Sequence, residues 1–420
     1  MRFINKILIL ATAILCLSLI TDPGVVFSEM SNAEIARELQ ALKARISNLE
    51  QTLTEKDKEI KDLKAQSDKA EKTVASNWAD KINVSGAIEL DYSSASDSDI
   101  GNNTINDSTS ELDIGTVELG VEIAFHEYVT GTAVLKGENL GSDNDRVFWD
   151  EASIAIEKEG FPLYFIGGHR GQPFGVFESH LINDPITQDL YEVVRPGATF
   201  GFTPDFFGLD ISATIYKGEE MMIHMLDGAY GLNRAYQDGA GALPGWRTGG
   251  MRATYAATDD VSSFIGSASI SPLKGLSLGL YYDSEPGDGR RNETLGGMVH
   301  YEIWKLAFDW EYIGALQRES DSVDNLEHKE SAWFGAIAFQ VIDPLELAIR
   351  YEAFDDDITA DQNGNLEDRF SLGATYTLFT KDNFTTSLMA EYRRSSFEKV
   401  AGAAVDDSLD EFFLKLALEF

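Results

Sequence analysis

The hydrophobic positions of this chain follow two spacings, and the spacing changes near residue 82. In the segment 117–125, Glu118 and Glu122 alternate with apolar residues at Val117, Leu119, Val121, Ile123 and Phe125. The segment 82–92 has the same pattern, with one face made by Ile82, Val84, Gly86, Ile88, Leu90 and Tyr92. Because a β-strand points alternate side chains to opposite faces, these segments predict strands with one apolar and one polar face.

The links between the predicted strands are alternately short and long. The short links lie near 126–127, 160–161, 205–206, 272–274, 304, 343–344 and 381–382. The long polar links cover approximately 94–110, 139–146, 171–194, 219–260, 286–292, 316–330, 356–366 and 395–407. This alternation predicts an all-β fold: an antiparallel transmembrane β-barrel of about 16 strands over residues 82–420, with both barrel ends on the periplasmic side. Residues 249–258 are either part of a long link or a further strand.

Before residue 82 the apolar spacing is that of a helix with a narrow seam. Its core positions step by four and three along Ile35, Leu39, Leu42, Ile46, Leu49, Leu53, Ile60 and Leu63. This heptad pattern predicts a short α-helical coiled coil over 29–64, followed by a polar linker over 65–81. A single amphipathic helix on a membrane is the alternative. A coiled coil implies self-association, and we predict a homotrimer.

The first 28 residues have the features of a secretory signal peptide. Arg2 and Lys6 precede an apolar run from Ile7 to Ile20 that is too short to span a membrane as a helix. Removal of residues 1–28 takes away Cys16 and changes the net charge from −36 to −37. So acidic a chain repels phosphate backbones, which excludes nucleic acid as a partner. The signal peptide and the predicted barrel together indicate a protein of the Gram-negative cell outer membrane, with its coiled coil in the periplasm.

The carboxy-terminal strand supports a membrane barrel. Apolar residues alternate to a terminal aromatic residue, and the predicted assembly signal consists of Phe412, Leu416, Leu418 and Phe420. A strand of an ordinary β-sandwich also alternates. A sandwich requires neither the signal peptide nor the regular alternation of links, so the three features together favour the barrel. Its expected surroundings are outer-membrane lipid and lipopolysaccharide.

The segment 167–192 interrupts the alternation after the fifth strand. A lumen of sixteen strands is wide enough for water, so selective passage needs a loop folded inward. The segment offers His169 and Arg170 for anions and Glu178, Asp184 and Asp189 for cations. Phe174 and Phe177 would fix such a loop, and Pro173 and Gly175 complete the motif. The alternative is a loop packed at the rim of the barrel.

The same segment carries a resemblance to a known family. Its residues Arg170, Pro173-Phe174-Gly175, Phe177-Glu178, Ile182, Asp184-Pro185 and Thr187, with WDEASIAI at 149–156, resemble the LbtU-type siderophore porin family. The resemblance implies a signal peptide, a coiled coil and a single barrel without a plug domain. It also implies outer-membrane passage of an iron-siderophore, although the identity of the chelate does not carry over.

Acidic and histidine residues suggest neither a metal centre nor an active site. Carboxylates are frequent in the loops 97–108, 141–146 and 355–368. These loops either bind calcium or are simply solvated, and the last of them lacks the spacing of an EF-hand. The six histidines are scattered, with no HExxH and no GxSxG at a strand-to-helix turn, so we predict no enzyme, cofactor or metal. Acidic loops predict a cation preference.

The competing functions are a porin for small hydrophilic solutes, selective or not, and a closed barrel acting as a cell-wall tether.

Overall fold

The computed structural model describes residues 81–96, 109–141, 145–218, 260–287, 289–319, 329–355, 366–397 and 408–420, together with Lys56, Lys61, Glu327 and Asp357. The chain divides into two compact units, Met1–Ala79 and Asp80–Phe420. The predicted signal peptide (1–28), almost all of the predicted coiled coil (29–64) and linker (65–81), and the segment 249–258 lie outside the described residues.

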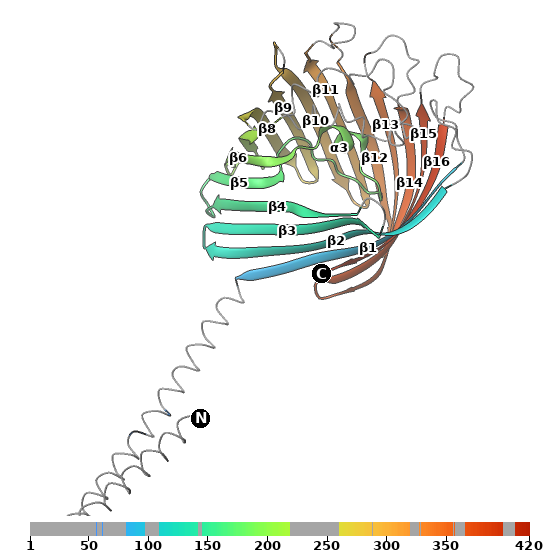
Figure 1. Ribbon diagram of the computed structural model, residues 1–420, viewed down its shortest axis with the longest axis horizontal. Coiled ribbons are helices and arrows are strands. Elements are labelled where there is room, and N and C mark those ends of the chain that lie inside the picture. Colours follow the sequence, from blue (N-terminus) through green and yellow to red (C-terminus); the bar gives the residue numbers. More distant parts are fainter. Residues whose placement is uncertain are drawn as a thin grey trace, which may run out of the picture. The chain divides into compact units, whose positions relative to one another are not determined.

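The second unit is a closed barrel of sixteen antiparallel strands in which each strand pairs with its neighbours in sequence and β1 pairs with β16 (Figure 1). The strands are β1 (Ile82–Ala95), β2 (Thr109–His126), β3 (Val129–Leu140), β4 (Arg146–Glu157), β5 (Leu163–Gly171), β6 (Val194–Phe202), β7 (Asp210–Lys217), β8 (Val261–Leu273), β9 (Leu276–Glu285), β10 (Asn292–Ile303), β11 (Leu306–Gln317), β12 (Ser331–Ile342), β13 (Leu345–Asp355), β14 (Leu366–Lys381), β15 (Phe384–Phe397) and β16 (Ser408–Glu419). The predicted fold class and strand number are confirmed.

Short turns join the strands at one end of the barrel, and long connections join them at the other. The short-turn end holds the links 127–128, 158–162, 203–209, 274–275, 304–305, 343–344 and 382–383. The start of β1 and the end of β16 lie at this end too. The connection after β5 differs from the other described connections because it contains a helix, α3 (Ile186–Tyr191).

The two faces of the barrel wall differ in chemistry. Apolar residues on the outer face are exposed, among them Ile88, Leu119, Phe200, Leu280 and Ile349. Such a continuous apolar surface is unfavourable in water and favourable against acyl chains, which is why the alternating pattern produces a transmembrane barrel. No helix in the described part of the chain is long and apolar enough to cross a membrane.

The barrel closes between β1 and β16. The backbone of Phe420 exchanges two hydrogen bonds of 3.0 Å with Gly86, and the Phe420 ring covers that glycine so closely that a Cβ atom there would lie 2.8 Å from it. On the inner face, Lys415 Nζ lies 2.6 Å from Glu89 Oε2 across the closing strands. Phe412, Leu416 and Leu418 share the outer face of β16 opposite Ser94, Leu90 and Ile88. Their role in assembly stays a prediction.

Candidate functional site

The connection between β5 and β6, residues 172–193, folds into the lumen, and we call it L3. Its root is closed by Gln172, whose backbone N–H donates to Val193 O at 2.7 Å. The Gln172 side chain donates to the backbone oxygens of Arg195 at 2.6 Å and Arg170 at 3.2 Å. From this root L3 carries α3 across to β11, β12 and β13, where Figure 1 shows it inside the barrel.

Apolar side chains of L3 fill one side of the lumen. Phe174, Ile186, Leu190, Tyr191 and Val193 are all fully buried, and they belong to one cluster with inward residues of the wall, Tyr216, Ile265, Tyr281 and Ile313. The rings of Phe174 and Tyr281 lie 5.8 Å apart. Because these groups exclude water, solutes have no passage between L3 and strands β7 to β11.

Carboxylates of the wall accept hydrogen bonds from the backbone of L3. Glu311 on β11 accepts from the Val176 N–H at 2.9 Å and from the Thr187 hydroxyl at 2.8 Å. Glu352 on β13 accepts from the Ile186 N–H at 2.6 Å, and Glu391 on β15 accepts from the backbone N–H of Asn183 at 2.9 Å. These bonds satisfy backbone donors that would otherwise be buried without partners, so they fix the path of the loop.

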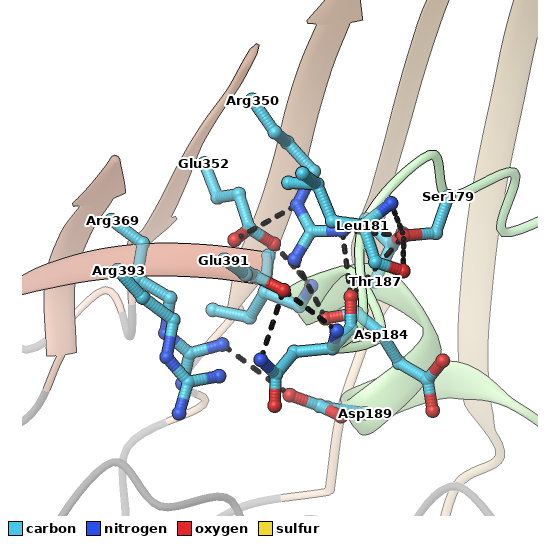
Figure 2. A network of polar contacts seen from close by, with 12 residues as sticks. Ser179, Leu181, Asp184, Thr187, Asp189, Arg350, Glu352, Arg369, Glu391 and Arg393 are labelled. Carbon is cyan, nitrogen blue, oxygen red and sulfur yellow. Dashed lines mark hydrogen bonds and ion pairs between the residues drawn. The ribbon is translucent and has the colours of Figure 1, made fainter. Parts of the chain in front are cut away.

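Arg350 on β13 binds polar groups at the tip of L3, which consists of residues 179–184 (Figure 2). Its guanidinium donates to the Ser179 hydroxyl at 2.8 Å, to Asn183 O at 2.9 Å and to Asp184 O at 3.0 Å. Its Nε atom lies 3.1 Å from Glu352 Oε2, and both side chains are fully buried. Figure 2 shows Arg350 and Glu352 facing the loop, and both belong to β13, so one strand presents both a donor and an acceptor to L3.

His180 links the tip of L3 to two acidic residues. Its Nε2 atom lies 2.9 Å from Asp309 Oδ2, and its Nδ1 atom lies 3.2 Å from Glu346 Oε1. The hydrogen bonds to Asp309 and Glu346 raise the pKa of His180 to about 10, against an ordinary value of 6.5. His180 is therefore a cation at neutral pH. Next to it, Leu181 packs on Ala307, Ala338 and Ala348.

Two carboxylates of L3 face different surroundings. Asp189 lies 3.5 Å from Arg369 on β14, and desolvation raises the pKa of Asp189 to about 6 while Arg369 opposes the shift. Asp184 lies near the tip, where its enclosed position in the lumen raises the pKa of the carboxyl. The positive charges of Arg350, Lys136 and Lys415 act in the opposite direction on Asp184. The last two come from β3 and β16, so the tip of L3 faces that part of the wall.

The wall formed by β16 and β1 to β4 is polar and lies opposite the strands that hold L3. Its two lysines are paired, Lys136 with Glu138 at 3.0 Å and Lys415 with Glu89 at 2.6 Å. Three more carboxylates are close enough to interact electrostatically with these two lysines: Asp91, Glu118 and Asp150. Arg146 of β4 also pairs with Glu138, so five acids stand against three cations. This side of the lumen is therefore negative, and it is the side that L3 leaves open.

The structure places two of the predicted constriction residues outside the loop. His169 and Arg170 both belong to β5, with Pro196 and Arg195 as their partners on β6. His169 shares the outer face with the exposed Ala152 and Pro196, so it does not line the lumen, whereas Arg170 lies on the inner face at the root of L3. The sequence did not reveal this because Gly167 and Gly168, which precede His169, have no side chains to extend the alternation.

The other predicted residues belong to L3. Pro173 is half-buried and Phe174 is buried, whereas Glu178 is exposed in the lumen. Gly175 (φ 81°) and Phe177 (φ 56°) both adopt left-handed backbone conformations, and the Phe177 ring folds back over Gly175 so that a Cβ atom there would overlap it. Only glycine fits at position 175. Asp184 and Asp189 lie on the tip and the helix, as described above.

Sequence reasoning missed the residues that hold L3. His180, Asp309, Glu311, Arg350, Glu352 and Glu391 were not singled out. Five of them are charged residues at inward positions of strands, which period-two alternation identifies as lumenal, but the alternation does not say which of them contact a loop. Among the described residues, no three His, Cys, Asp or Glu side chains are arranged to hold a metal ion. The acidic loop 97–108 lies outside the described residues, as does the larger part of the loop 355–368.

Solved structures with the same fold are outer-membrane proteins. The outer membrane channel DcaP of Acinetobacter baumannii is 9% identical, with a TM-score of 0.52 over 81% of this chain and 97% of that chain. OmpF of Salmonella typhi, in complex with daunomycin, is 11% identical, with a TM-score of 0.50 and the same coverage. OmpT of Vibrio cholerae is 10% identical, with a TM-score of 0.50, again over 81% and 97%. No family model and no curated protein matches the chain.

Proposed function

We propose that this protein is an outer-membrane porin that passes small hydrophilic solutes and catalyses no reaction. The observation that carries the proposal is the path of L3, which is fixed to β11, β13, β14 and β15 and leaves the charged wall of β16 and β1 to β4 facing the lumen. A loop fixed on one side of a wide barrel narrows the lumen without sealing it. The shared fold of the channel DcaP adds support.

The passage favours cations. Asp184 and Glu178 on L3 and the five carboxylates of the opposite wall outnumber its three cations, Lys136, Arg146 and Lys415. A narrow passage with excess negative charge concentrates cations and repels anions.

Single-channel recording of the purified full-length protein in planar bilayers tests both statements. We expect discrete conductance steps and a reversal potential of cationic sign in a salt gradient. Replacing Glu118 by Gln should move that potential toward zero, whereas Glu159→Gln, in the exposed turn between β4 and β5, should leave it unchanged. A barrel without conductance would show that it is a closed anchor, such as a cell-wall tether.

Passage of an iron-siderophore is a narrower version of this proposal, and the resemblance of L3 to the LbtU-type family supports it. Growth on a panel of iron chelates as sole iron source, with and without the gene, is the test. Equal growth of both strains on every chelate would leave a general porin.

The proposed location is the cell outer membrane, with phospholipid and lipopolysaccharide against the apolar outer face and the coiled coil in the periplasm. We further propose that the coiled coil joins three copies. OmpT of Vibrio cholerae, which shares the fold, has a trimer form.

A further inference from the structure

A cavity of about 290 Å³ opens in the lumen beneath L3, toward the short-turn end of β10 to β13. Its floor consists of alanines, because Ala307 on β11 is opposite Ala338 on β12. Ala348 continues the row on β13, and Leu181 of L3 packs over these three methyl groups. Larger inward side chains at these positions would fill the space.

Charged groups of both signs surround the floor. Glu302 is opposite Ala307 on one side, and Glu346 is opposite Gln340 on the other. Lys305 belongs to the turn between β10 and β11, and its ammonium group donates to Val341 O at 3.3 Å. The side chains of Glu302 and Glu346 are 67% and 30% exposed, so both carboxylates remain accessible to a ligand.

Neighbouring histidines contact these carboxylates, and the His180 cation offsets part of the charge of Glu346. His180 contacts both Glu346 and Asp309, so the imidazolium is shared between two carboxylates. His300 Nδ1 lies 2.5 Å from the same Asp309, while its Nε2 atom is 3.6 Å from Glu302. The cavity therefore presents acceptors at two edges and one ammonium donor, Lys305.

We propose that this cavity is a binding site for a small zwitterion that carries one ammonium and one carboxylate group. The ammonium group binds Glu302, the carboxylate binds Lys305, and the aliphatic part lies against Ala307, which is only partly buried. The space corresponds to about ten water molecules at ~30 Å³ each, which suits a solute of amino-acid size. A dianion is repelled by the two glutamates, and an apolar solute leaves the polar rim unsatisfied. The inference rests on the proposed function only in that solutes must reach the lumen.

Titration of the full-length protein in detergent, followed by NMR of the ligand, tests the proposal with 4-aminobutanoate as the probe. Butylamine and butanoate carry one charge each and should bind about tenfold more weakly, since each lacks one charge-assisted contact. Glu302→Gln and Lys305→Gln should reduce binding of the zwitterion to the level of these analogues. Glu159→Gln and Lys274→Gln, on exposed turns elsewhere, are the matched controls and should change nothing.

Equal binding of the three probes, or full binding by Lys305→Gln, would overturn the proposal. Ala307→Leu gives an independent test, because it fills the floor without changing any charge and should abolish binding of the zwitterion. Failure here is distinct from failure of the proposed function. A protein that binds 4-aminobutanoate but shows no conductance retains this site and is no porin. A conducting protein without binding is a porin without this site.

Discussion

At the scale of single residues, the lumen is organised by charged side chains that bind the backbone of a loop. Arg350 donates to three oxygen atoms of L3, and Glu311, Glu352 and Glu391 accept hydrogen bonds from the donors of L3. Such groups are costly to bury alone, and the loop supplies the partners they need. The charged wall residues therefore hold L3 in place, and L3 supplies the partners that allow these residues to be buried.

The pH dependence of stability should reveal His180. Its pKa is about 10 in the fold and 6.5 in an unfolded chain, so its contribution is complete below about pH 6.5 and disappears as the pH rises to 10. The loss is at most ~1.4 kcal/mol per pH unit over that interval. Unfolding in detergent at several pH values should show a steeper decline for the natural protein than for His180→Gln. Identical slopes would contradict the assignment.

Replacing Arg350 by Met should loosen L3. The variant loses three hydrogen bonds and leaves Glu352 without its ion-pair partner, which we expect to lower the free energy of unfolding by about 3 kcal/mol. Single-channel records should also show increased current noise. The matched control is Arg394→Met on the outer face, where a half-exposed pair with Asp410 should contribute less than about 1 kcal/mol. Similar losses in both variants would argue against anchoring by Arg350.

At the scale of elements, each strand has two functions. Its outer side chains meet lipid, and its inner side chains line the lumen or hold L3. The strand β16 illustrates the arrangement, since Phe412 and Leu416 lie on its outer face while Lys415 pairs with Glu89 inside. One strand thus contributes to insertion, closure and the charge of the passage.

The terminal strand should also direct assembly. Replacement of Phe420 by Ala removes the ring that covers Gly86, and we expect several-fold less folded barrel in the outer-membrane fraction. Folded barrel is measured by its altered gel mobility without heating. Phe379→Ala, an exposed aromatic residue of β14, is the control. An equal loss with Phe379→Ala would remove any special role from the terminal residue.

At the scale of the whole barrel, the lumen is asymmetric. L3 is held on the side of β11 to β15, and its apolar cluster runs along β7 to β15 and also includes Ala95 of β1 and Leu409 of β16. The acidic wall of β16 and β1 to β4 faces the space that remains. The asymmetry follows from the direction in which L3 leaves β5. Its anchors on β13 and β15 lie across the barrel from β5 and β6 in the closed strand order.

The number of copies is a testable property of the assembly. Mass measurement in detergent should give three chains, and Leu42→Glu with Leu49→Glu should reduce the mass to one chain, because both leucines belong to the predicted seam. Lys43→Glu, beside the seam, should leave the trimer intact. A dimer would contradict the prediction.

The sequence by itself determined the barrel. Strand period, turn positions and the two faces of the wall are local properties, so residues two apart in sequence suffice to predict them. The same local information placed Phe174, Glu178, Asp184 and Asp189 in a connection that breaks the alternation. It did not show that His169 and Arg170 belong to β5, because two glycines conceal the end of that strand.

Only the tertiary structure decided where L3 lies and what the passage contains. Thr187 and Glu311 are separated by 124 residues, and Asn183 and Glu391 by 208. Pairings over such distances depend on which strands the closed barrel brings opposite β5, and no local pattern encodes that choice. His180 shows the consequence: in the sequence it is one of six scattered histidines, and in the fold it is a cation held between Asp309 and Glu346.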